Sequence, residues 1–235
     1  MSKNILIDAN AKFANYIAIN NNEITKVFCK EINQDLTQWL VESFKWFVYA
    51  SKNNLKELDT VYFVNGPGSF TNIRLSNVLV KTICILNKNI KIKELDRLSF
   101  YEDKNLKQII IMTSSRIQKF IYIHNKNEVI LKTTLISNEE FEVYKKQFKD
   151  YLILDITNEH FNEEFRDINK LNLDLFKEID VLDLKANYLK EPNIDMKVKE
   201  KLNFYASSVL IGLFSKFAIS VFSFEKLFSK INVKT

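Results

Sequence analysis

The chain has 235 residues, of which 46% are hydrophobic and 13% aromatic, enough for one large or two small folded domains and too apolar for an intrinsically disordered chain. Its formal net charge is +5 with no long basic run, which permits contact with a nucleic acid but does not argue for it. The two cysteines, Cys29 and Cys84, form no C-x-x-C pair, so a disulfide framework and a zinc-finger motif are excluded. Because the first residues also lack the apolar run of a signal peptide, we expect a cytoplasmic protein.

Three short strands are expected first, over 4–8, 13–19 and 24–30, joined by Asn-rich turns. A helix follows, with Asp35 and Gln38 in the spacing of a capping box. Its apolar residues, which include Trp39 and Trp46, cover a little over half of the helical wheel, more than one sheet requires. Either neighbouring elements of the chain cover the excess or a partner protein does, and the sequence leaves both open.

The most informative stretch of the sequence is a strand, a tight turn and a helix N-terminus. The strand is expected over 61–64, Gly66-Pro67-Gly68 makes the turn, and Ser69 or Thr71 caps a helix that runs to Leu86. Such a turn aims backbone N–H groups and the positive end of a helix dipole at one point, so it could bind a phosphate. It matches neither a dinucleotide fingerprint nor a P-loop, and it could also serve only as a connection.

The helix after this turn carries two apolar stripes. The first stripe consists of Leu75, Val78, Leu79, Thr82 and Leu86, and the second of Ile73, Asn77, Val80 and Cys84. Two stripes on one helix predict that one faces the sheet and the other faces a second helix. Combined with the wide stripe of the preceding helix, they predict a partner interface formed by Trp39, Trp46, Ile73, Asn77, Val80 and Cys84.

The order of elements then repeats. A strand over 90–95 and a short helix over 98–102 are followed by strands over 108–113, 118–124 and 128–136. A helix that is capped by Asn138 and runs through Phe148, a strand over 151–156, an amphipathic stretch over 169–179 and a last strand over 181–188 complete the series. Two successive βββαβα units predict an α/β protein of the actin-like ATPase (ribonuclease H-like) fold, with an N-terminal lobe over 1–104 and a C-terminal lobe over 105–193.

Residues 194–235 are expected to form an extra, apolar helical tail. The stretch 204–224 has one charged residue, Lys216, and is about as long as a membrane span. Three interpretations remain open: a helix buried against this protein or a partner, a helix on a membrane surface, and a spanning helix. We expect the first of these, and no membrane association.

Four segments resemble one known family. Gly66-Pro67-Gly68-Ser69-Phe70-Thr71, followed by Arg74, resembles the G-P-G-S-F-T-G-[LVI]-R signature of the TsaB (YeaZ) family, although Asn72 stands where the family has glycine. The stretch 5–8 is similar to the family's opening I-L-A-I-D, 188–192 to its Y-L-R-x-[PN] segment, and 112–116 to a D-A-R segment, here without the acidic residue. The resemblance covers residues 4 to about 193.

The resemblance implies a function. TsaB proteins are non-catalytic subunits of the bacterial complex that makes N6-threonylcarbamoyladenosine at position 37 of tRNA. By resemblance, this chain would bind and support a TsaD-type catalytic subunit and act with a TsaE-type ATPase, which would carry the ATP and the metal. Contact with tRNA would be indirect or weak, and the isolated chain could form a homodimer. The family's motif loop corresponds to Asp8, Gly66, Pro67, Gly68, Ser69, Phe70, Thr71 and Arg74.

The chain's own chemistry agrees with a non-catalytic role. In actin-like ATPases a D-x-G-x-[ST] turn wraps the nucleotide phosphates, but the turn that begins at Asp8 has no glycine. Ser69 has no recognisable base beside it, and His124 and His160 are expected to be ordinary surface histidines, so we predict no cofactor and no metal site. The alternatives are an autonomous ATP-binding enzyme that uses Asp8 and the 66–71 loop, and a peptidase, for which no triad or metal cluster is evident.

Overall fold

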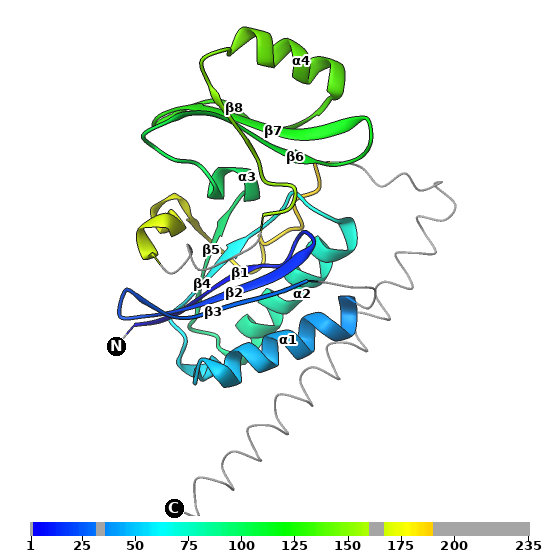
Figure 1. The fold of residues 1–235 in the computed structure, drawn as a ribbon. Helices are drawn as coiled ribbons and strands as arrows, with labels where there is room; N and C mark the ends of the chain where they lie inside the picture. The colour runs from blue at the N-terminus through cyan, green and yellow to red at the C-terminus, as the bar shows by residue number, and fades with distance from the viewer. Residues whose placement is uncertain (1, 32–35, 160–166, 190–235) are drawn as a thin grey trace, which may run out of the picture. The chain divides into compact units, whose positions relative to one another are not determined.

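The computed structural model describes residues 2–31, 36–159 and 167–189, and its first sheet has six strands in the order β10-β5-β4-β1-β2-β3 (Figure 1). The strands are β1 (Lys3–Asp8), β2 (Phe13–Asn20), β3 (Glu23–Glu31), β4 (Thr60–Val64), β5 (Lys91–Leu95) and β10 (Lys177–Ile179). β1 is antiparallel to β2 and parallel to β4, which is itself parallel to β5. β1 and β4 therefore end at the same edge of the sheet, where the motif loop begins.

Two long helices, α1 (Leu36–Ala50) and α2 (Phe70–Leu86), lie along one face of this sheet (Figure 1). The contact with α1 is built around Tyr16 of β2. Its ring lies 5.4 Å from the ring of Phe44 and 5.3 Å from that of Phe47, and its hydroxyl is 3.1 Å from Ser43 Oγ. Burial of these aromatic rings is the largest favourable term available to such a layer.

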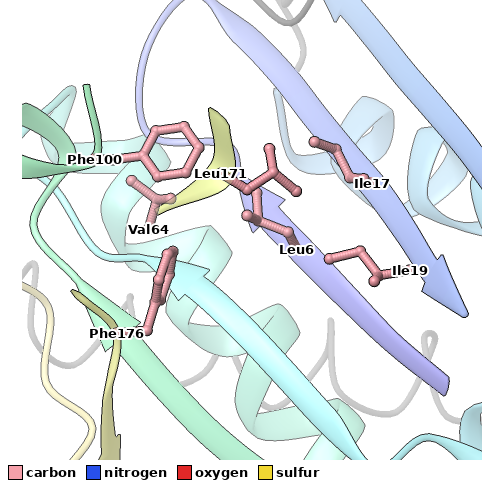
Figure 2. Packing of buried hydrophobic residues seen from close by; sticks show 7 residues of the cluster. All are labelled: Leu6, Ile17, Ile19, Val64, Phe100, Leu171 and Phe176. Atoms are coloured by element: carbon pink, nitrogen blue, oxygen red, sulfur yellow. The ribbon is translucent and has the colours of Figure 1, made fainter. Parts of the chain in front are cut away.

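The opposite face of the sheet carries a second apolar cluster, shown in Figure 2. It consists of Leu6, Ile17, Ile19, Val64, Phe100, Leu171 and Phe176. Because successive residues of a strand point to opposite faces, Ile17 lies in this cluster while Tyr16 faces α1. Burial on both faces explains why the central strands are almost continuously apolar.

The second sheet has four strands in the order β8-β7-β6-β9. They are β6 (Lys107–Thr113), β7 (Gln118–Asn125), β8 (Glu128–Ser137) and β9 (Leu152–Asp155). The helix α4 (Asn138–Gln147) packs on one face through Phe141, and the short helix α3 (Arg97–Phe100) packs on the other through Leu98. α4 begins with a capping box of Ser137 and Glu140, so the predicted cap, Asn138, is wrong by one residue.

The predicted βββαβα order is confirmed for the first lobe, and βββαβ is confirmed for the second. The amphipathic stretch predicted over 169–179 is not a long helix. It contains two 3-10 turns, Ile168–Leu171 and Leu173–Leu175, separated by Asn172 in the left-handed region with φ 46°. A residue in that conformation interrupts a right-handed helix.

The last described strand also differs from the prediction. No strand lies over 181–188; instead, β10 pairs antiparallel with β5, with Ile179 opposite Ile92. With Leu171 and Phe176 in the core of the first sheet, the chain therefore returns to the first sheet after β9.

The predicted tail over 194–235 lies outside the described residues. Among the residues described, none of the helices is both long enough and apolar enough to cross a membrane.

Candidate functional site

The motif loop joins β4 to α2, and its conformation depends on its glycines. Gly66 has a φ of +65°, and a Cβ there would lie 2.9 Å from the carbonyl oxygen of Asn187, while the Gly66–Pro67 bond is cis. A Cβ on Gly68 would collide with the backbone carbonyl of Asn10. The loop therefore requires glycine for backbone approach and for a left-handed φ.

The loop is held by direct hydrogen bonds to the connection between β1 and β2. The Ser69 N–H donates to the Asn10 carbonyl at 2.8 Å, and the Asn72 side chain donates to the Ala11 carbonyl at 2.6 Å. Asn10 in turn donates to the Val64 carbonyl and accepts from the Ser76 hydroxyl at 2.7 Å. Asn72, the residue that departs from the family signature, thus fastens the two loops to each other.

Ser69 caps α2, as one of the two predicted alternatives stated. Its Oγ accepts from the Asn72 N–H at 3.5 Å, and Thr71 lies exposed in the first turn. With its N–H bonded to Asn10 and its hydroxyl occupied in the cap, Ser69 has the environment of a structural residue.

Asp8, at the end of β1, is fully buried and forms an ion pair with Arg97, the first residue of α3. Arg97 Nη1 donates to Asp8 Oδ1 at 2.5 Å and also to Oδ2. The Arg97 N–H donates to the Gly66 carbonyl at 2.5 Å, and Nη2 lies 3.5 Å from the Glu159 carbonyl. Burial raises the pKa of the Asp8 carboxyl, and the positive charge of Arg97 opposes that shift.

Two segments of the family resemblance meet at the other side of the loop. The rings of Phe70 and Tyr188 stack with centroids 4.5 Å apart, and the Arg74 guanidinium lies 5.2 Å above the Phe70 ring. Stacking of this kind contributes about 0.5–1.5 kcal/mol beyond the buried area. Tyr188, the first residue of the Y-L-R-x-[PN]-like segment, therefore packs on the first residue of α2.

A cavity of about 470 Å³ lies beside the motif loop. Its lining residues come from the loop, the β1–β2 connection and the second sheet; they are Ala11, Lys12, Gly68, Ser69, Asn72, Met112, Thr113, Ser114, Phe120 and Thr157. Lys12 is the one charged residue of this lining in the part of the chain that the structure describes, and it pairs with Glu31 at 2.9 Å. Hydroxyl and amide groups therefore dominate its polar chemistry. Among the described residues, His, Cys, Asp and Glu side chains form no group of three that could hold a metal ion.

The predicted partner interface is only partly exposed. Trp39 and Trp46 of α1 are 41% and 67% exposed, but Ile73 and Val80 of α2 are 2% and 0% exposed. The prediction that Ile73 and Val80 are available to a partner is wrong, because their side chains are buried in the chain's own core. Asn77 is also buried, where its side chain donates to Asn65 Oδ1 at 3.1 Å.

The sixth predicted interface residue, Cys84, is partly exposed, and burial raises the pKa of its thiol to about 11. Sequence reasoning missed two exposed apolar residues on the same pair of helices, Tyr49 and Ile85. Periodicity locates the stripes of a helix but does not say which one faces the sheet, so this pair could not be chosen in advance.

Two buried polar residues were also missed. Arg97 has a fully buried side chain, and the one sequence signal for it is a charge set directly before Leu98-Ser99-Phe100. His124, predicted to lie on the surface, is fully buried on β7 and hydrogen-bonded through both ring nitrogens.

Comparison with known proteins identifies the fold. The chain matches no family model, and no curated protein matches its sequence. Its structure is similar to the crystal structure of "an uncharacterized protein with similarity to peptidase YEAZ from Pseudomonas aeruginosa", with a TM-score of 0.63, 12% identity, and coverage of 81% of this chain and 100% of that chain. YeaZ from Pseudomonas aeruginosa aligns with a TM-score of 0.49 and 13% identity over 58% of this chain and 66% of that chain. At such identities the likeness shows the fold alone: this chain has the mixed α/β fold of a YeaZ-like protein.

Proposed function

We propose that this chain is a non-catalytic, TsaB-like subunit that binds and supports a TsaD-type catalytic subunit in the synthesis of threonylcarbamoyladenosine in tRNA. Two findings support the proposal together: the YeaZ-like fold, and the meeting of the resembling segments around the motif loop, where Phe70 stacks on Tyr188 and Gly66 approaches Asn187. ATP and metal would be held by the TsaD-type and TsaE-type partners, and contact with tRNA would be indirect.

The proposal that this subunit is non-catalytic rests on the buried environment of Asp8. In an actin-like ATPase the carboxylate at the end of the first strand faces the nucleotide, but here both of its oxygens accept hydrogen bonds from Arg97 in a fully buried pair. The neighbouring loop bonds directly to the β1–β2 connection through Ser69 and Asn72. The groups that would contact a nucleotide phosphate are thus bonded to one another.

The proposed partner surface is the outer side of α1 and α2, defined by Trp39, Trp46, Tyr49 and Ile85. The rings of Trp46 and Tyr49 lie edge to face with centroids 6.3 Å apart, and Lys30 Nζ lies 4.6 Å from the Trp39 ring. Exposed tryptophan and tyrosine are the residues most enriched at the energetic centres of protein interfaces. This surface replaces the predicted set, because Ile73, Asn77 and Val80 are buried.

The test is co-purification of the full chain with the TsaD-type subunit of its own cell. Trp46→Asp combined with Tyr49→Asp should abolish capture, because it places charges in the desolvated centre of the interface. The matched control is Ile117→Asp, which changes a residue of similar exposure, 69%, between β6 and β7. Unchanged capture by a folded Trp46/Tyr49 variant would show that the surface is misplaced, and absence of any TsaD-type protein in the wild-type capture would contradict the proposed function.

The second candidate, an autonomous ATP-binding enzyme, is favoured by one observation. The 470 Å³ cavity beside the start of α2 is within the size range of ligand sites. Calorimetry with ATP and Mg²⁺ on the isolated chain discriminates the two functions. We expect no saturable binding heat, and tight binding with hydrolysis by this chain alone would favour the enzyme.

A further inference from the structure

The outer side of α2 carries apolar and cationic residues in alternation. Arg74, Val78, Lys81 and Ile85 follow one another at intervals of three or four residues, so they lie on one side of the helix. Ile85 is 64% exposed and the other three are partly exposed, whereas Val80, on the side that faces the core, is fully buried. Because Ile85 belongs to the proposed partner surface, Arg74 and Lys81 extend that surface along α2.

The charges of Arg74 and Lys81 have no counter-charge within the described part of the chain. Over residues 2–31, 36–159 and 167–189, neither side chain forms an ion pair with a carboxylate. The Arg74 guanidinium lies 5.2 Å above the Phe70 ring, a contact that holds the group in place but adds no negative charge. Two cations therefore lie beside exposed apolar residues without an acidic partner in these ranges.

Neither cation stabilises α2 itself. The helix contains no acidic residue, so neither Arg74 nor Lys81 has a carboxylate three or four positions away with which to pair. Arg74 also lies near the N-terminal end of the helix, which begins at Phe70, and the macrodipole favours anions at that end. Both charges are thus available to a carboxylate outside this chain.

We propose, building on the proposed function, that Arg74 and Lys81 pair with carboxylates of the TsaD-type subunit. The facing surface of that subunit is then apolar at its centre and acidic along the line of α2. Charge complementarity supports this partner chemistry, because α1 and α2 together contain three cations, Lys45, Arg74 and Lys81, and one acid, Glu42. Charges arranged in this way speed up encounter and set partner choice more than they add affinity.

A protein fits this surface better than a nucleic acid does. Val78 and Ile85 alternate with the cations of α2, and Trp46 and Tyr49 lie exposed on α1. Protein interfaces combine an aromatic and apolar core with a charged rim. Affinity for a phosphate backbone instead grows with the number of phosphates neutralised, and the two cations of α2 can neutralise about two, which supports only weak binding.

The test measures binding between the purified full chain and the purified TsaD-type subunit of its own cell at several salt concentrations. Arg74→Glu combined with Lys81→Glu should raise Kd about tenfold or more at about 50 mM salt, because like charges would then face each other across the interface. Most of this change should be seen as slower association. The effect should shrink at about 500 mM salt, where screening is stronger.

Two further variants control for net charge and for folding. Lys132→Glu combined with Lys146→Glu makes the same change of net charge at exposed positions on β8 and α4, and should leave Kd nearly unchanged. Lys81→Glu alone keeps the contact between Arg74 and Phe70, so it tests the charge without disturbing the start of α2. It should weaken binding in the same direction by a smaller factor.

The outcomes separate the acidic partner surface from the proposed function. Equal Kd values for the Arg74/Lys81 variant and the control would overturn the acidic partner surface and leave the proposed function intact. Failure of the wild-type chain to bind the TsaD-type subunit at any salt concentration would contradict both. Unchanged binding to that subunit, together with weaker binding of tRNA by the Arg74/Lys81 variant, would assign the cations to phosphates and overturn the proposal.

Discussion

Arg97 and Asp8 lie 89 residues apart in the chain and form an ion pair from which solvent is fully excluded. The pair joins the end of β1 to the start of α3, and the backbone N–H of Arg97 extends the connection to Gly66 in the motif loop. A buried pair of this kind places a positive charge against the carboxylate without any ligand. Its removal can therefore be tested on the isolated chain.

We expect Arg97→Met to lower the free energy of unfolding by about 3–5 kcal/mol, because it leaves the Asp8 carboxylate buried without its counter-charge. The double variant Asp8→Asn, Arg97→Met removes both charges, so its free energy of unfolding should fall by less than that of Arg97→Met. Urea unfolding followed by circular dichroism measures both values. Equal losses in the single and double variants would mean that Arg97 contributes through packing and not through its charge.

The close approach of Gly68 to Asn10 gives a prediction for the motif loop. Gly68→Ala should destabilise the protein by about 1–3 kcal/mol or more, because the added methyl group would collide with the Asn10 carbonyl and neither backbone can move freely. Ser69→Ala, in the next position, removes only the cap of α2 and should cost about 1 kcal/mol. Thermal denaturation measures the loss of stability in both variants. A larger loss for Ser69→Ala than for Gly68→Ala would contradict this account.

A charge introduced on the buried side of α2 should destabilise the folded protein, whereas a charge on the exposed side should have little effect on stability. Ile73→Asp places a carboxylate at a site that is 2% exposed, so the folded protein should be strongly destabilised. Ile85→Asp, on a residue that is 64% exposed, should leave the unfolding free energy within about 0.5 kcal/mol of the wild type. Only Ile85→Asp can therefore report on partner binding. A stable Ile73→Asp protein would show that α2 turns its other side to the sheet.

The order of elements along the chain is predicted well as far as β9, because the apolar periodicities of β1, β2, β4 and α2 are all strong. The sequence also predicts the turn at Gly66 and Gly68, since few other residues fit such a backbone. The prediction fails where local structure depends on contacts between residues that are far apart in the sequence. The inward side of α2 is selected by Asn65 and the sheet, and the break at Asn172 is fixed by side-chain hydrogen bonds to the carbonyls of Phe100 and Glu102.

The candidate site shows the same limit. Asp8, Gly68 and Ser69 could be named from the motif and its spacing, yet the partner of Asp8 comes from a segment with no motif of its own. Arg97 reaches Asp8 because β5 lies beside β4, which is a property of the sheet and not of the residues near Arg97. A single sequence therefore located the loop but not the ion pair that defines its chemistry.

The thiol of Cys84 provides a test that depends on pH. Burial raises its pKa from the ordinary value of 9.0 to about 11. A difference of two pH units means that the reactive thiolate is about 100-fold scarcer than in an ordinary thiol at pH 8. In a Cys29→Ser background, alkylation at Cys84 should therefore be about 100-fold slower than alkylation of a model thiol, and it should speed up about tenfold per pH unit.

The same shift predicts a change of stability, and its sign follows from the proton balance. Between pH 9 and 11 the folded chain holds the Cys84 proton while the unfolded chain has lost it, so stability is fully present below pH 9 and falls as the pH rises through this window. Burial also raises the pKa of Tyr16, which acts in the same direction at higher pH. The difference between wild type and Cys84→Ala isolates the thiol: it should be constant below pH 9 and shrink above it. A difference that stays constant up to pH 11 would mean that Cys84 ionises as readily in the folded chain as in the unfolded one.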